Sequence, residues 1–519
     1  MSIEADDLWK LNRFLSIGTE GPLYEFGEQI LKKESAPTIS KLIEDGKGKE
    51  VVKEVLAYTK EGKSIRKTPL LFCLALCTRS SDKIAKRDAY KALAEVCTLP
   101  TDLFTFIAFS QTLNNPSKGW GKLQRKTISS WYNSKDPKQL AENATRYKSK
   151  AGWTHKDVLR LTHTKASNDG VALVLKYVIK GLKVAKAEFD SDGNATGQLR
   201  ELLDYLEAVD TLKHSTDDQQ VARLVEQHQL SYEHIPSIHL NSSEVWNTLA
   251  YRLPLPMLLQ NISKIASQGL LEPTNDTSKH IIERLKNTDE ILSSKIHPYS
   301  VLIALRTYEQ GKGLRRKWNR IPQVVEALNF TLNTAIQNVP RTGKRFLVAV
   351  KADDNVFRNA VRGAPVISTK LAAALMSMII AHKEDDFQLL LLLPAVALNL
   401  KITPNMQLSE ICDLICSFPL LQNARDLSLP VKWAIAKKSL IDVFLVITDC
   451  RECISDISPG EAMKLYRTKM DMPNAKYINC AISTNRLRFA DPSDNGMLDV
   501  AGFDENAPRV IHDFVLGNL

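Results

Sequence analysis

The sequence lacks a hydrophobic run long enough to cross a membrane. Its most apolar window, LLLLLPAVALNL at residues 389–400, is shorter than the roughly 20 residues that a spanning helix needs, and Pro394 interrupts it. The first residues, MSIEADDLWK, are acidic and polar, so we expect no secretory leader. We therefore expect an intracellular protein that does not associate with a membrane. The expected compartment is the cytoplasm, with the nucleus as a second one.

Motifs of catalytic and metal sites are missing as well. The sequence has no GxxxxGK[ST] phosphate loop, no HExxH pair and no nucleophile elbow. Cys450 and Cys453 form a CxxC pair, but no second CxxC and no nearby His completes a zinc site. The sequence thus predicts a protein without cofactors that is not an enzyme.

Basic charge is what the sequence does have, and it is concentrated in one segment. The net charge is +10, yet residues 338–519 hold 21 Lys and Arg against 20 Asp and Glu. Residues 118–165 alone hold 12 Lys and Arg against 3 Asp and Glu. A basic cluster within otherwise balanced sequence indicates a polyanionic partner.

The pattern of apolar residues predicts two domains. Residues 1–337 show apolar spacing near three and four, which indicates helix after helix and favours stacked helical pairs, although no fixed repeat length is visible. After Pro340, strands alternate with helices, which indicates a mostly parallel sheet covered on both faces. The predicted strands are 345–350, 387–393, 441–448 and 475–482. The predicted helices are 368–383, 407–416, 428–438, 459–470 and 505–516.

A helix predicted over GWGKLQRKTISSWYN, residues 119–133, carries the first basic group. Lys122, Arg125 and Lys126 share one face, because residues three and four apart are neighbours on a helix. The apolar side chains expected to anchor this helix to its neighbours are Leu123, Ile128 and Trp131.

A second basic group lies in TRYKSKAGWTHKDVLRLTHTK, residues 145–165. Thr154 followed by Asp157 indicates a helix start. Lys156, Arg160 and His163 then follow on one face. The segment before this helix presents Arg146, Lys148 and Lys150.

Aromatic residues are interleaved with these cations. Single-stranded RNA needs cations for its phosphates and planar groups on which its bases stack. The aromatic candidates are Trp120, Trp131, Tyr132, Tyr147 and Trp153. A solvated helix face and a buried Trp131 explain the same pattern without RNA, so from these residues alone both interpretations stay open.

Seven segments in order resemble the Ro autoantigen family, the TROVE-module RNA-binding proteins of Y-RNA particles. They are RFLSIGTEG, LIEDGKGKEVV, GWGKLQRKTISSWYN, GWTHKDVLRLTH, IHPYSVLIALRTYEQGKGLR, TGKRFLVAV and ADPSDNGMLDVAGFD. The resemblance implies a TROVE module of HEAT-like helical repeats forming an RNA-binding ring over residues 1–337. It implies a Rossmann-like α/β domain of the von Willebrand factor A type over residues 338–519.

The function that the resemblance implies is RNA binding within a small cytoplasmic ribonucleoprotein. The implied partners are Y-type small noncoding RNA and the single-stranded ends of misfolded noncoding RNA, as in small-RNA quality control. The resemblance also places Arg146, Lys150 and His163 at RNA-contacting positions. Relatives have lysine at position 146 and arginine at position 150, so the positive charge is kept at both.

The metal-ion-dependent adhesion site of many A domains is altered in this sequence. That site consists of an Asp-x-Ser-x-Ser loop together with a Thr and an Asp from two later loops. Here the first loop holds Lys351, Asp353 and Asn355. Arg425 stands at the Thr position, and only Asp449 keeps the expected residue type. Two cations replace two oxygen ligands, and a divalent ion would be repelled by them. We therefore predict no bound Mg²⁺, with Lys351 and Arg425 pairing with Asp353 and Asp449. A loop that has diverged, with Lys351 in solvent, is the alternative.

A protein-interaction scaffold without RNA is the competing function. Helical solenoids and A domains commonly bind proteins, and the A domain is the expected place for such partners. The basic segment at 118–165 favours RNA, because a peptide scaffold has no need of its excess of positive charge.

Overall fold

The structure is a computed structural model that describes residues 3–27, 29–114, 119–313, 316–351, 359–394, 396–417, 426–449, 453–484 and 487–519. Contacts divide the chain into two units: unit 1 is Met1–Glu20 with Ile30–Arg252, and unit 2 is Gly21–Gln29 with Leu253–Leu519. The sequence places the domain boundary at 337/338, later than this division, because the last helices before the strands pack within unit 2. The implied ring involves both units together and stays a prediction.

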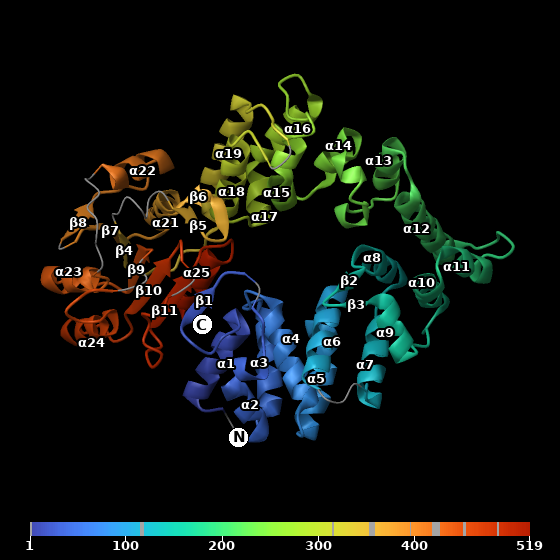
Figure 1. The fold of residues 1–519 in the computed structure, drawn as a ribbon, viewed down its shortest axis with the longest axis horizontal. Helices are drawn as coiled ribbons and strands as arrows, with labels where there is room; N and C mark the ends of the chain where they lie inside the picture. Colours follow the sequence, from blue (N-terminus) through green and yellow to red (C-terminus); the bar gives the residue numbers. More distant parts are fainter. Residues whose placement is uncertain are drawn as a thin grey trace. The chain divides into compact units, whose positions relative to one another are not determined.

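Unit 1 is helical, as predicted, and successive helices pack side by side (Figure 1). Its α-helices are α1 (Ala5–Ile17), α2 (Pro37–Glu44), α3 (Gly48–Glu61), α4 (Lys67–Arg79), α5 (Lys83–Val96), α6 (Pro100–Thr112), α7 (Lys122–Asn133), α8 (Pro137–Arg146), α9 (His155–Thr162), α10 (Asp169–Lys180), α11 (Leu182–Phe189), α12 (Gly197–His214), α13 (Asp218–Gln227) and α14 (Ser243–Arg252). The shorter elements are η1 (Lys33–Ser35), β2 (Ser149–Lys150), β3 (Trp153–Thr154), η2 (Tyr232–His234) and η3 (His239–Asn241).

Local sequence signals determine where several of these helices begin. Helix α8 starts at Pro137, whose missing N–H costs nothing at the first helical position. The carboxylate of Asp136 caps it by accepting hydrogen bonds from the backbone N–H groups of Lys138 and Gln139. One continuous apolar core, which extends from Leu11 in α1 to Leu206 in α12, holds the helices together.

Unit 2 combines α-helices and a 3₁₀ turn with an α/β domain. The first elements are α15 (Leu255–Ala266), α16 (Asp276–Leu285), α17 (Thr288–Ser294), α18 (Pro298–Glu309), α19 (Pro322–Ala335) and η4 (Ile336–Asn338). The strands are β1 (Leu23–Glu25), β4 (Phe346–Lys351), β5 (Ala360–Val361), β6 (Ala364–Ser368), β7 (Phe387–Leu392), β8 (Ala397–Leu400), β9 (Val443–Thr448), β10 (Lys476–Ala481) and β11 (Met497–Ala501). The helices of the α/β domain are α21 (Thr369–Lys383), α22 (Leu408–Cys416), α23 (Leu429–Lys437), α24 (Pro459–Lys469) and α25 (Ala507–Leu516).

The sheet of unit 2 has the order β1-β11-β10-β9-β4-β7-β8. All neighbouring strands pair in parallel except β7 and β8, which are antiparallel. After β4 the chain continues to β7 on one side, whereas β9 lies on the other, so the topological switch point is between β4 and β9. Ligands of such sheets bind beyond the carboxyl ends of the strands at this point.

Alternate residues of the central strands face the two sides of the sheet. Leu347 and Ala349 of β4 and Phe444 of β9 belong to a core that also contains Val431 of α23 and Met463 of α24. Helix α21 packs against β4 and β7. The fold is therefore the predicted one, a helical region followed by an A-type α/β domain. Within the described residues, no helix has both the length and the apolar character that crossing a bilayer requires.

Candidate nucleic-acid interface

Helix α7 presents its predicted cations to solvent. Lys122, Arg125 and Lys126 are exposed, whereas Ile128 and Trp131 are buried at 0% and 1% exposure. One anchor prediction was wrong, because Leu123 is 40% exposed. The buried residue of this turn is Gln124, whose side-chain oxygen accepts a hydrogen bond of 2.9 Å from the Arg79 guanidinium. This contact joins α4 to α7 and is not visible in the local sequence pattern.

A small hairpin brings Lys150 to the start of α7. Strands β2 and β3 pair Lys150 with Trp153 across a two-residue turn, Ala151-Gly152, in which both residues have positive φ of 52° and 79°. Such a turn matches the twist of antiparallel strands. The Trp153 ring lies against the Trp120 ring at a centroid distance of 5.5 Å. Since Trp120 comes two residues before Lys122, this contact joins the hairpin to the first cations of α7.

Helix α9 continues from the hairpin and begins as the sequence predicts. The Thr154 side chain accepts a hydrogen bond from the backbone N–H of Asp157, and the Asp157 carboxylate accepts one from the N–H of Thr154, each 3.2 Å long. Lys156 and Arg160 are exposed on the helix. His163 follows its end, exposed and in the left-handed conformation with φ of 50°.

These elements are neighbours in the fold, since α9 contacts both α7 and β3. We call their exposed cationic side chains and His163 the basic surface. Its members are Lys122, Arg125, Lys126, Lys150, Lys156, Arg160 and His163.

Arg146 is engaged within the protein. Its guanidinium donates two hydrogen bonds to the Glu233 carboxylate, at 3.1 and 2.9 Å, and this raises the pKa of Arg146. It also lines a cavity of about 810 Å³ whose wall includes Glu142 and Glu201. A polyanion is repelled by such a wall. Contact between Arg146 and RNA therefore requires its guanidinium to leave Glu233 or to be shared with it, and this assignment stays a prediction.

Lys148 has a cationic neighbour that the sequence pattern did not indicate. The Lys148 side chain is exposed, but partial burial and then the charge of Lys213 lower its pKa. Lys213, on α12, donates a hydrogen bond of 2.7 Å to the Tyr177 hydroxyl. The two lysines are far apart in the sequence, so only the packing of α12 brings Lys213 to Lys148.

Three of the five aromatic residues proposed for base stacking are not available to RNA. Trp131 and Tyr132 are each 1% exposed, and Trp120 is 8% exposed. The Trp131 indole N–H donates to the carbonyl of Cys97, and the Tyr132 hydroxyl is 2.9 Å from Nδ1 of His155. These partners satisfy the polar atoms that burial removes from water. Tyr147 and Trp153 are half-buried; the Arg146 guanidinium lies over the Tyr147 ring, and the Trp153 ring lies against Trp120.

The A domain contains an ion pair at the switch point of its sheet. The Lys351 ammonium, at the end of β4, lies 3.0 Å from the Asp449 carboxylate, directly after β9. Lys351 is 6% exposed, so its side chain does not point into solvent. The other altered adhesion-site positions, Asp353, Asn355 and Arg425, lie outside the described residues.

The described residues at this point do not fit a divalent ion. A polar cavity of about 300 Å³ lies beside the pair and is lined by Asn359, Ala360, Asp449, Ser483 and Thr484. Mg²⁺ needs oxygen ligands at close range, and the carboxylate that would supply one is already paired with the Lys351 ammonium. An ion here would also face the charge of Lys351 in a confined site.

Comparison with known proteins matches both parts of the chain. Residues 1–307 match the TROVE domain, and residues 345–515 match the Ro60 vWA domain. The "RNA-binding protein RO60" of Caenorhabditis elegans is 28% identical over 575 residues, covering 99% of this chain and 88% of that protein. The "RNA-binding protein RO60" of Deinococcus radiodurans is 29% identical over 514 residues, covering 98% of this chain and 93% of that protein. The crystal structure of the Deinococcus radiodurans RO (RSR) protein is similar with a TM-score of 0.89 and 27% identity, covering 99% of this chain and 100% of that one.

Proposed function

Because the chain belongs to the family of TROVE-domain proteins that carry a Ro60 vWA domain, we propose that it binds RNA through the basic surface of unit 1. The relatives are named as RNA-binding proteins and not as enzymes. The observation that carries the proposal is the exposure of the predicted cations on three neighbouring elements, α7, the β2–β3 hairpin and α9. This surface lies within the TROVE match.

The proposed RNAs are Y-type small noncoding RNAs and the single-stranded ends of misfolded noncoding RNAs. Lysine and arginine on several elements can follow a phosphate backbone, and release of its counterions drives binding. Trp153 and Tyr147 are half-buried and are the remaining aromatic candidates on which unpaired bases can stack. We propose that the protein acts in this way within a small cytoplasmic ribonucleoprotein that serves small-RNA quality control.

The salt dependence of RNA affinity tests the proposal. Replacing Lys122, Arg125 and Lys126 together with Gln removes three charges from α7 and leaves its buried face intact. The slope of log affinity against log salt is expected to fall by about two, since each phosphate contact on a single strand contributes about 0.7. Fluorescence anisotropy with a labelled single-stranded RNA at several salt concentrations measures this slope.

A matched variant separates the basic surface from net charge. Lys41, Lys49 and Lys53 are exposed on α2 and α3, in the same unit, and replacing them with Gln removes the same charge. This control is expected to keep the wild-type slope. Equal loss in both variants, or no loss in the first, contradicts RNA binding at the basic surface.

The role of Arg146 can be tested through its partner. Glu233→Gln removes the carboxylate charge that holds the Arg146 guanidinium. If Arg146 contacts a phosphate, Glu233→Gln strengthens RNA binding and Arg146→Gln weakens it. If Arg146 has only a structural role, neither change alters the salt slope, although both lower the thermal midpoint.

A further inference from the structure

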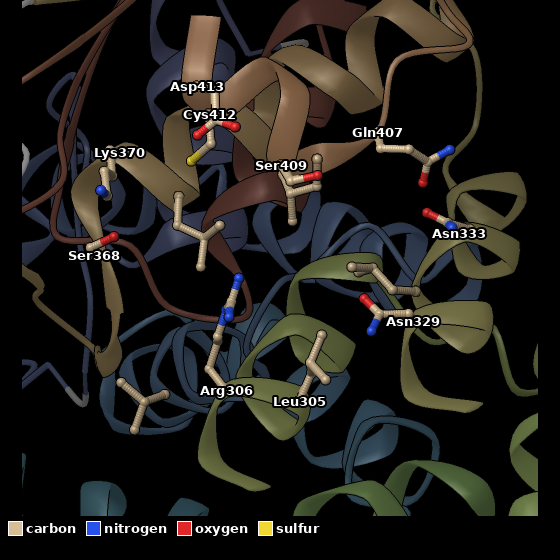
Figure 2. Close-up of a pocket in the computed structure, with 14 residues that line it drawn as sticks. Leu305, Arg306, Asn329, Asn333, Ser368, Lys370, Gln407, Ser409, Cys412 and Asp413 are labelled. Atoms are coloured by element: carbon tan, nitrogen blue, oxygen red, sulfur yellow. The ribbon is translucent and has the colours of Figure 1, made fainter. Parts of the chain in front are cut away.

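Unit 2 contains a cavity of about 590 Å³ between its helical part and its α/β domain. Helices α18 and α19 form one wall, and β6, α21 and α22 form the other (Figure 2). It is distinct from the ion pair at the switch point, because neither Lys351 nor Asp449 lines it. Polar and apolar side chains both line this cavity, so its chemistry can be examined group by group.

Two cations from different elements line the cavity. The Arg306 guanidinium donates one hydrogen bond of 2.6 Å to Glu309 through Nη1, while its Nε is buried and has no hydrogen-bond partner among the described residues. The Arg306 side chain as a whole is 38% exposed and lines the cavity. Lys370, the second residue of α21, is exposed and makes no ion pair within the described part of the chain.

The charges of both cations act on the thiol of Cys412. Burial is the largest cause of the raised pKa of Cys412, about 11; Cys416 and Asp413 also raise this pKa, whereas Lys370 and Arg306 lower it. Cys412 itself lines the cavity. The positive charges of Lys370 and Arg306 therefore both act at Cys412, together with the negative charge of Asp413.

Side-chain amides gather on another side of the cavity. Asn329 and Asn333 lie one turn apart on α19, and Gln407 comes directly before α22. In Figure 2 these three amides lie on the side opposite Lys370 and Ser368, with Arg306 between the two groups. Amides present a donor and an acceptor together, which matches the edges of nucleobases.

The remaining lining suits the other parts of a nucleotide. Leu305, Leu332, Leu371 and Leu408 supply apolar surface for the faces of a base. Among the described residues of the lining, Asp413 is the one carboxylate, and it can accept from ribose hydroxyl groups. A phosphate, a base edge, a base face and a ribose each have a complementary group in one cavity.

We propose that this cavity binds one phosphorylated nucleotide, with its phosphate at Arg306 and Lys370 and its base between the amides and the leucines. The nucleotide is either a free nucleoside monophosphate or the terminal nucleotide of an RNA chain, since both carry the same groups. The proposal uses only residues of unit 2 and does not depend on RNA binding by the basic surface of unit 1.

Isothermal titration calorimetry tests the proposal. The full chain is titrated with each of the four nucleoside 5′-monophosphates in turn. Arg306→Gln and Lys370→Gln are each expected to weaken binding about ten-fold, because each loses a charged hydrogen bond to the phosphate. Asn333→Ala is expected to change the preference among the four bases. Lys437→Gln, which removes an exposed charge on α23 outside the cavity, is the matched control and is expected to bind as the wild type does.

Crosslinking identifies where on the protein the nucleotide binds. Competition then shows whether the site takes a free nucleotide or the end of an RNA chain. Photocrosslinked 4-thiouridine monophosphate is expected in peptides that contain residues 329–333 or 407–413. A short RNA with a 5′-phosphate competes with it if the site takes chain ends, and only mononucleotides compete if it takes free nucleotides. Crosslinks confined to other peptides, unchanged affinity in Arg306→Gln and Lys370→Gln, or inorganic phosphate binding as tightly as every nucleotide overturns the proposal. Failure of the basic surface to bind RNA leaves all of these outcomes unaffected.

Discussion

Lys351 stabilises the carboxyl end of the A-domain sheet by pairing with Asp449. Both side chains are largely removed from water. Losing one partner of such a pair leaves an uncompensated charge and costs about 3 kcal/mol. Lys351→Met is therefore expected to lower the midpoint of chemical unfolding of the A domain, measured by circular dichroism in urea.

Two further measurements distinguish this ion pair from a metal site. The double variant Lys351→Met with Asp449→Asn removes both charges and is expected to recover much of the lost stability. Calorimetric titration of the wild type with Mg²⁺ is expected to show no tight uptake, because the ammonium already neutralises the carboxylate. Tight uptake by the wild type would show that the pair opens for a metal ion.

Asp499 is a buried carboxyl in β11 whose protonation is coupled to stability. It is 2% exposed, and burial raises its pKa from 3.8 to about 6, although hydrogen bonds from the N–H groups of Phe489 and Ala490 oppose the shift. The folded state thus holds the proton more tightly than the unfolded state. The contribution of Asp499 to the free energy of unfolding is most favourable below pH 4. It falls by about 3 kcal/mol as the pH rises to 6.

Asp499→Asn is expected to remove this dependence. The amide oxygen can still accept from the N–H groups of Phe489 and Ala490, and the side chain stays neutral at every pH. Relative to the wild type, the variant gains stability at pH 7 and gains nothing at pH 4. Urea midpoints of both proteins at the two pH values measure the difference, and equal differences would contradict the assignment.

At the scale of the element, the capping box of α9 fixes the start of a helix that carries two cations of the basic surface. Thr154→Ala removes the oxygen that caps the N–H of Asp157 and is expected to cost about 1 kcal/mol. Hydrogen exchange of the amides in residues 155–159 is expected to become faster. Thr154→Ser keeps the hydroxyl and is the matched control, and equal exchange in both variants would show that the cap does not hold this helix end.

Local sequence patterns predict the longer helices and strands of the α/β domain but not its short or distantly paired strands. Helix α21 and strands β4, β7 and β9 lie where their apolar patterns place them, because each is long enough to bury a continuous face. Strands β1 and β11 were missed. Strand β1 is only three residues long and pairs with β11, which lies more than 470 residues later in the chain. Long-range pairing of this kind leaves no local periodicity.

At the scale of the whole molecule, the two units are expected to differ in their response to acid. In unit 1, burial lowers the pKa of both His155 and His234 to about 4. The unfolded chain takes up these protons from pH 6.5 downwards and the folded chain does not, so stability falls as the pH falls from 6.5 to 4. At pH 5 the two losses amount to about 4 kcal/mol. In unit 2, His297 acts in the same direction but Asp499 opposes it.

Tryptophan fluorescence separates the two responses, because five of the seven tryptophans lie in unit 1. The urea midpoint followed by fluorescence is expected to fall strongly between pH 7 and pH 5. His155→Gln removes one titrating ring and is expected to reduce this fall by about half. A midpoint that does not change with pH would show that the buried histidines are not the cause.

The sequence by itself determined the family, the helical and α/β parts and the segment in which the cations lie. Each of these depends on local patterns, namely apolar periodicity, capping residues and charge density along the chain. Only the tertiary structure decided which side chains are available. It buried Trp131 and Tyr132, bonded Arg146 to Glu233, and brought Lys351 to Asp449, because burial and ion pairing depend on residues that are distant in the sequence. Exposure is a property of the packed fold, and no local pattern contains it.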